Sequence, residues 1–176
     1  MEPSITVRRA VAHDYPRILS DLADLLIACV QSGASVSFLH PLPQEKARTF
    51  WLQVASEIRG GARIQLVAEN KAGQILGTVQ LAFAQPENQP HRAEVSKLLV
   101  HPAARRQGIG ERLMRELERI AQSAGKTLLV LDTASADAER LYLRLGWRLC
   151  GRIPGYALSP LGDPCATNIY YRDLLG

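Results

Sequence analysis

Residues 94–121, EVSKLLVHPAARRQGIGERLMRELERIA, constrain the fold more than any other part of the chain. The stretch opens with an apolar run at 95–100, which is typical of a largely buried strand. Pro102 ends that strand, because proline has no N–H to donate to a sheet ladder. From Ile109 onward, apolar residues recur at helical spacing and charged residues hold the other faces, which predicts an amphipathic helix. We therefore expect a strand, a short loop and a helix at the centre of the fold.

The loop between this strand and helix carries Arg105, Arg106, Gly108 and Gly110. The first N–H groups of a helix lack intrahelical partners and lie at the positive end of the helix dipole. Glycines let a ligand oxygen approach the backbone, and arginines add positive charge. The loop is therefore suited to phosphate, although such glycines also serve turns and packing, and arginines are often only solvated.

Two other phosphate-binding motifs do not fit this loop. A P-loop has Lys and then Ser or Thr after its last glycine, whereas Glu111 and Arg112 follow Gly110 here. A dinucleotide-binding fingerprint has a third glycine where Leu113 stands. The sequence thus argues against a nucleotide triphosphatase and against a dinucleotide-binding enzyme.

The rest of the chain alternates between predicted strands and helices. Periodicity, glycines and prolines predict strands at 5–9, 63–69, 74–83, 128–131, 147–153 and 167–171, and helices from Asp14, from near Pro43 and at 136–145. Residues 33–40 and 154–164 are expected to be long loops. The pattern predicts a mixed α/β fold.

Length and composition predict one domain over residues 1–176. A chain of 176 residues with 47% apolar and 22% charged residues is long enough to bury a proper core. No apolar run approaches the ~20 residues that a membrane-spanning helix needs. The first residues lack a basic region followed by an apolar core. We therefore expect no membrane partner.

Cysteines and charge suggest the compartment and exclude some partners. The chain has three cysteines, Cys29, Cys150 and Cys165, without metal-ligand spacing, which indicates a reducing compartment and no metal site. The cytoplasm is the expected location. The net charge is +4, but no basic run is interleaved with aromatic residues, so nucleic acid is not an expected partner.

Three motifs resemble those of the GNAT acetyltransferase superfamily. Residues 105–110 match its pyrophosphate loop of Arg or Gln, two residues, Gly, one residue, and Gly or Ala. Residues 127–132 resemble its fifth strand, and residues 138–147 resemble the helix that follows and its ending of Tyr and Gly-Phe. The resemblance implies acetyl-CoA as the cofactor and a mixed central sheet of about seven strands flanked by about four helices.

Further segments resemble the tabtoxin-resistance type of acetyltransferase within that superfamily. They are Gly-Ala-Ser-Val at 33–36, Arg-Ala-Glu-Val at 92–95, Leu-Asp-Thr at 131–133, and the runs at 154–160, 162–164 and 166–170. This resemblance implies direct acetyl transfer, with general-base assistance, to a small-molecule amine or toxin-like amino acid, and a role in antibiotic or toxin resistance. The alternatives are a protein amine acetyltransferase and a non-catalytic CoA-binding regulatory module. A homodimer is a further expectation.

The resemblance also implies catalytic roles for three residues. Glu94 and Asp132 take the proton of the amine, directly or through water, and Tyr142 protonates the leaving thiolate. The alternatives are that Glu94 caps a strand edge, Asp132 caps the next helix and Tyr142 belongs to the core. Because the two strands are expected to be parallel, Glu94 and Asp132 are expected at opposite edges of the sheet unless the strands splay apart.

The remaining site residues are expected along the strand, the loop and the following helices. The expected cofactor-binding residues are Leu98, Leu99, Val100, Arg105, Arg106, Gln107, Gly108, Ile109, Gly110, Glu111, Arg112, Ser135 and Tyr142. Ser135 stands where many relatives carry Asn, and its hydroxyl can replace one amide hydrogen bond to the pantetheine arm. Ser35, Phe38 and Tyr156 are the expected substrate-binding residues.

Overall fold

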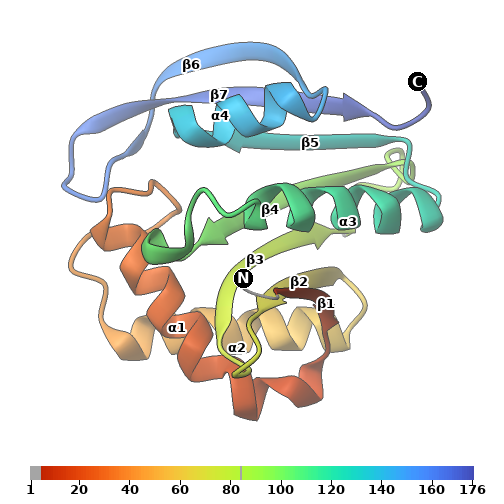
Figure 1. The fold of residues 1–176 in the computed structure, drawn as a ribbon. Coiled ribbons are helices and arrows are strands. Elements are labelled where there is room, and N and C mark those ends of the chain that lie inside the picture. Colours follow the sequence, from red (N-terminus) through yellow and green to blue (C-terminus); the bar gives the residue numbers. More distant parts are fainter. Residues whose placement is uncertain (1–4, 84) are drawn as a thin grey trace.

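The computed structural model describes residues 5–83 and 85–176. The strands are β1 (Thr6–Ala10), β2 (Arg63–Glu69), β3 (Ile75–Ala82), β4 (Arg92–Val100), β5 (Leu128–Thr133), β6 (Arg148–Leu158) and β7 (Pro164–Asp173) (Figure 1). The α-helices are α1 (Tyr15–Gln31), α2 (Gln44–Arg59), α3 (Ile109–Ser123) and α4 (Ala136–Arg144). Within the described ranges, no helix is both long enough and apolar enough to cross a bilayer.

The strands form one sheet in the order β1-β2-β3-β4-β5-β7-β6 (Figure 1). All neighbouring strands are antiparallel except β4 and β5, which are parallel and joined through α3. The predicted fold class, a mixed α/β sheet of seven strands with four helices, is confirmed.

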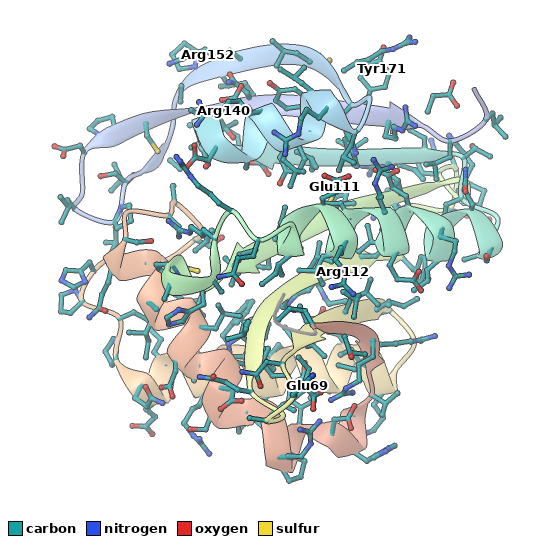
Figure 2. The ribbon with its side chains drawn as sticks, viewed as in Figure 1. Glu69, Glu111, Arg112, Arg140, Arg152 and Tyr171 are labelled. Carbon is teal, nitrogen blue, oxygen red and sulfur yellow. The ribbon has the colours of Figure 1, made fainter. Side chains whose placement is uncertain are left out.

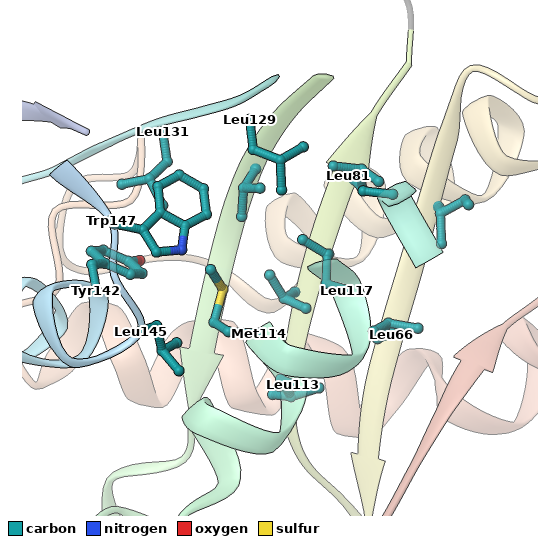
Figure 3. Packing of buried hydrophobic residues seen from close by; sticks show 14 of the residues in the cluster. Leu66, Leu81, Leu113, Met114, Leu117, Leu129, Leu131, Tyr142, Leu145 and Trp147 are labelled. Atoms are coloured by element: carbon teal, nitrogen blue, oxygen red, sulfur yellow. The ribbon is translucent and has the colours of Figure 1, made fainter. Parts of the chain in front are cut away.

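Apolar side chains cover the sheet with helices on both faces. The helices α1 and α2 share one buried cluster with Val67 and Leu99, whereas α3 packs on the opposite face. Figure 3 shows Leu113, Met114 and Leu117 of α3 lying against the strands. These three residues carry the helical periodicity of the central stretch, so the predicted amphipathic helix is confirmed.

A bulge in β4 moves its side chains from one face of the sheet to the other. Ser96 pairs with Gln80 and Leu99 with Thr78, so two residues of β4 oppose one residue of β3. Strict alternation would put Val95 and Leu99 on the same face, but Val95 packs with α3 and Leu99 packs with α1 and α2. Lys97, with φ +52°, occupies the bulge.

The parallel strands β4 and β5 separate after a short paired segment. Within the described residues, their ladder joins residues 92–94 to residues 128–130 and goes no further. The remainder of β4 therefore turns backbone N–H and C=O groups toward a gap that β5 does not fill. The candidate site lies at this separation.

The expected loop at 154–164 is wrong. The strand β6 continues to Leu158 and β7 begins at Pro164, which leaves residues 159–163 as the turn. The pairing of β6 with β7 shifts register between Ile153 and Ala157, and Gly155 in that segment has φ +59°. Proline and glycine usually interrupt strands, but an edge strand such as β6 accommodates them in a bulge.

Candidate active site

A cleft of about 780 Å³ lies where β4 and β5 separate. Its walls come from β4, the loop at 105–110, the first turn of α3, the end of β5, α4, and the connection between α1 and α2. The sheet places all of these elements at the carboxyl ends of the two parallel strands, where ligands bind in open α/β sheets.

Two glycines shape the loop at the start of α3. Gly108 precedes the helix with φ +74°, a left-handed conformation that side-chain-bearing residues rarely adopt. A Cβ at Gly110 would lie 3.1 Å from Cδ2 of Leu141, so this glycine allows α3 and α4 to approach closely. Gly108, Gly110 and Glu111 line the cleft, and the unpaired N–H groups of the first helical turn lie there as well.

The three arginines of this region have different positions. Arg105 donates to Oγ of Ser32 (2.9 Å) and to the carbonyl of Val100 (3.3 Å), and like the exposed Arg106 it lines the cleft. Arg112 instead donates to the carbonyl of Ile5 (2.6 Å) and is not among the lining residues. Figure 2 shows Arg112 on the side of α3 toward β3, with Glu111 on the side toward α4. The structure therefore does not bring Arg112 to the cleft, and the exposed Gln107 also lies outside its lining.

The cleft is lined by the residues of β4 that were expected to bind a pantetheine arm. The expected residues Leu98, Leu99 and Val100 line it along the unpaired edge of β4, which has backbone groups free to bond an amide-bearing chain. Ser135 also lines the cleft. Its Oγ accepts from the N–H of Ala138 at 3.3 Å and caps α4, so Ser135 fills the capping role that was the alternative for Asp132.

Asp132 lies at the end of β5 and lines the cleft with an exposed carboxylate. The hydroxyl of Thr167, on β7, donates to Oδ2 of Asp132 at 2.8 Å. This single hydrogen bond orients the carboxylate and leaves its other oxygen available to a ligand.

Glu94 lies closer to Asp132 than expected. It is the third residue of β4 and pairs with Val130, which is two residues before Asp132 on β5. Paired residues, and residues two apart on one strand, point to the same face, so Glu94 and Asp132 share a face of the sheet. The expectation of opposite sheet edges excepted strands that splay apart, and β4 and β5 do separate after Glu94, the last residue of β4 in their paired segment. Glu94 is exposed, accepts from Arg92 at 3.0 Å and lies outside the cleft lining.

Tyr142 is buried and lines the cleft from α4. Its ring lies 5.8 Å from that of Trp147 and 6.0 Å from that of Tyr170, and Figure 3 shows it beside Trp147 and Leu131. Burial, and after it the negative charge of Asp132, raise the pKa of the Tyr142 phenol above its ordinary value. The phenol is therefore protonated at neutral pH and is suited to donating a hydrogen bond to a thiolate.

Two segments meet at the end of the cleft that Ser35 and Ser159 line. Oγ of Ser35 donates to the carbonyl of Leu158 at 3.3 Å, and the N–H of His40 donates to the carbonyl of Pro160 at 2.8 Å. The connection between α1 and α2 is thereby joined to the turn between β6 and β7. Of the expected substrate residues, only Ser35 lines the cleft.

Phe38 and Tyr156 lie elsewhere. The ring of Phe38 packs against that of Phe50, 5.3 Å between centroids, and is not in the lining. Tyr156 is 56% exposed on β6 and is not in the lining either, because the hairpin carries it away from the cleft.

Lys97 and Ser37 also line the cleft, although neither is among the expected site residues. The apolar pattern at 95–100 predicts a regular strand and gives no sign of the bulge that redirects the side chain of Lys97. A lysine inside an otherwise apolar, buried run was the available signal. Among residues 5–83 and 85–176, no cluster of three His, Cys, Asp or Glu could hold a metal ion.

Solved acetyltransferases share the fold of this chain, a mixed sheet whose parallel central strands separate at the cleft. Residues 25–147 match the sequence model of the Acetyltransferase (GNAT) family, and the chain belongs to this family. The expected class, an acetyltransferase of the GNAT family, is confirmed at the level of the family.

Three relatives illustrate the similarity. The IAA acetyltransferase of Azospirillum brasilense is 30% identical over 100 residues, which cover 56% of this chain and 63% of that protein. The N-acetyltransferase of Staphylococcus aureus Mu50 superposes with a TM-score of 0.79 at 19% identity, covering 97% of this chain and 99% of that one. The phosphinothricin acetyltransferase of Sinorhizobium meliloti, solved with acetyl-CoA, gives 0.79 at 22% identity, covering 98% and 89%. At these identities the structural matches show the fold alone.

Proposed function

We propose that the protein is an N-acetyltransferase that transfers the acetyl group of acetyl-CoA directly to the amine of a small molecule or toxin-like amino acid, as in the tabtoxin-resistance type. The observation that carries this proposal is the contact between two segments at the acceptor end of the cleft, where Ser35 and His40 bond to residues 158 and 160. A protein acceptor needs an open groove for the chain on both sides of its amine. Two segments joined across this end favour the small-molecule acceptor.

Acetyl-CoA supplies an activated thioester, and this chain's residues bind and orient it. The N–H groups of residues 107–110 and the arginines Arg105 and Arg106 bind the pyrophosphate. The free edge of β4 at residues 98–100 bonds the pantetheine arm. These residues line one continuous cleft from the N-terminus of α3 along β4 to Asp132. One bound cofactor therefore reaches both the glycine loop at 105–110 and the candidate base.

Asp132 and Glu94 are the proposed bases. Tyr142 is the proposed hydrogen-bond donor to the thiolate, in place of the expected proton transfer, because the raised pKa of its phenol keeps the proton on the tyrosine. Asp132 lines the cleft and takes the proton of the amine directly, whereas the exposed Glu94 acts through ordered water. A thiol has an ordinary pKa of about 8.5, and the phenol of Tyr142 stays protonated where the thiolate forms.

Two other expectations remain proposals. We place the protein in the cytoplasm on its free cysteines, and we propose a homodimer on its edge strand β6. The strand exposes Leu149, Ile153 and Leu158, and an apolar edge strand is a surface that a second copy can cover. Sedimentation at several concentrations tests the dimer.

A thiol-release assay tests the enzymatic proposal. Purified protein and acetyl-CoA are incubated with amino acids, polyamines, aminoglycosides and tabtoxinine-type lactams, and with a lysine-containing peptide. We expect acceptor-dependent release of CoA with at least one small amine and little with the peptide, and mass spectrometry identifies the acetylated product. Release with the peptide alone would favour the protein acetyltransferase, and tight CoA binding without any release would favour the regulatory module.

A further inference from the structure

The ammonium group of Lys97 is held in the cleft without a carboxylate partner. Its Nζ donates to Oγ of Ser37 at 3.1 Å and lies 5.7 Å from the ring centroid of Phe50. Every Lys, Arg or His ion pair within the described part of the chain has an arginine as its cation, so Lys97 belongs to none of them. A hydroxyl and a ring face hold the ammonium in place but do not neutralise it.

The bulge of β4 explains why Lys97 is there. Ser96 faces the side of the sheet that α1 and α2 cover. The bulge directs the side chain of Lys97 to the same side, where it meets Ser37 and Phe50. Two consecutive polar residues thus line the acceptor end of the cleft. Bulges commonly re-aim a side chain beside an active site.

The ammonium of Lys97, rather than the guanidinium of Arg63, is the cation available to an anion at this end of the cleft. Arg63 donates to Oγ of Ser96 at 3.4 Å, but its charge is matched by Glu57 at 2.5 Å. Burial, and after it the charge of Arg63, lower the pKa of Lys97, while Asp132 opposes them. A bound carboxylate would offset that burial, because an opposite charge favours the charged form of a lysine.

We infer that Lys97, positioned by Ser37 and Phe50, binds a carboxylate of the acceptor, so that the substrate is a zwitterion with its amine at Asp132. This inference rests on the proposed acetyl transfer to a small amine. An acceptor with an amine alone would bring a second cation beside Lys97, whereas an amino-acid-like acceptor pairs each of its charges with an opposite charge of the cleft.

Binding of bisubstrate conjugates tests the inference without turnover. CoA is linked through its sulfur and an acetyl group to glycine, β-alanine or γ-aminobutyrate, each with a free carboxylate or with that carboxylate capped as a primary amide. We expect at least one acid conjugate to bind about tenfold more tightly than its amide, the scale of a charge-assisted hydrogen bond. The chain length of the best conjugate reports the separation of amine and carboxylate in the acceptor.

Two lysine variants make the test specific. Lys97→Met keeps a long side chain on Phe50 and should abolish the difference between acid and amide while leaving the affinity for CoA itself unchanged. Lys46→Met is the matched control, because Nζ of Lys46 lies 5.9 Å from the ring of Phe38, outside the cleft lining, and it should keep the difference. Equal binding of acid and amide by the parent, or an unchanged preference in Lys97→Met, overturns the inference. Thiol release decides the proposed function separately.

Discussion

Asp132 and Glu94 are the two proposed bases, and their surroundings differ at the scale of single residues. Both lie on one face of the sheet, two residue levels apart, but only Asp132 lines the cleft. Asp132 has one hydrogen bond from Thr167, and Glu94 has one from Arg92. Their environments therefore suit a direct base and a base that acts through water.

The substitutions Asp132→Asn and Glu94→Gln test these roles. We expect each to lower kcat by roughly 10²-fold, the scale of lost general-base catalysis, with nearly unchanged KM for acetyl-CoA. Steady-state kinetics measure both constants. Asp173→Asn is the control that should keep kcat, because Asp173 ends β7, whereas Thr167, the partner of Asp132, lies near the start of that strand. Unchanged kcat in either variant would remove that residue from the mechanism, and a loss of folding would indicate a structural role.

The loop and the first turn of α3 act together at the scale of an element. Gly108 adopts φ +74° where its Cβ would meet no atom within 4 Å, so the requirement for glycine here is conformational rather than steric. The same loop carries Arg106, whose side chain is exposed at the cleft.

Gly108→Val should abolish measurable CoA binding, because a branched side chain disfavours the left-handed backbone that aims the N–H groups at the phosphates. Gly125→Val is a matched control, since Gly125 has the same φ of +74° and equally open surroundings, but it follows α3 away from the cleft. Calorimetric titration should show lost affinity in the first variant and retained affinity in the second, with similar losses of thermal stability. Equal CoA affinity in both would mean that the loop does not bind the pyrophosphate.

Arg106→Gln should weaken CoA binding more at low salt than at high salt, because the exposed guanidinium contributes mainly through screened charge. Arg152→Gln on β6 removes the same charge from an exposed strand outside the cleft lining (Figure 2) and should leave the affinity unchanged. Dissociation constants measured at about 20 mM and 300 mM salt supply the comparison. A salt-independent loss in Arg106→Gln would point to a change in loop structure instead.

At the scale of the whole molecule, a charge cluster joins the first strand to α1 and β2. Arg8 bonds to Asp14 at 2.8 Å and to Glu69 at 2.7 Å, and Arg17 bonds to Glu69 at 3.1 Å. The hydrogen bond from Arg17, and after it that from Arg8, hold the pKa of Glu69 below its ordinary 4.5. The position of Glu69 between these elements is visible in Figure 2.

A folded-state pKa below that of the unfolded chain means that the unfolded chain binds more protons in acid. The contribution of Glu69 is therefore complete above about pH 5 and is lost as the pH falls through the folded pKa. Glu69→Gln should lower the free energy of unfolding at pH 7 by about 1 kcal/mol and flatten its fall between about pH 5 and pH 3. Urea titrations across this range measure the free energy of unfolding, with Glu87→Gln, at an exposed position in the loop between β3 and β4, as a control. An unaltered pH dependence in Glu69→Gln would show that Glu69 is equally protonated in both states.

The local pattern of the sequence determined most of the helices and strands and the glycine loop at residues 105–110. Apolar spacing predicted the strand and helix around residues 105–110, because that spacing follows directly from backbone periodicity. The order of strand, helix and strand required a parallel pair, and the structure confirms it between β4 and β5. The glycine loop and the strand that line the cleft were thus readable from the chain alone.

Only the tertiary structure decided how the side chains meet at the acceptor end. The bulge at Lys97 depends on the pairing of β4 with β3, and that pairing joins residues too far apart in the chain for local periodicity to report. Arg112, expected at the phosphates, is drawn to the carbonyl of Ile5 at the other end of the chain. Tyr156 is exposed because it lies on the edge strand β6, which continues through Pro154 and Gly155 although these residues had indicated a loop. Local sequence determines periodicity and turns, whereas contacts between distant segments decide which side chain enters the cleft.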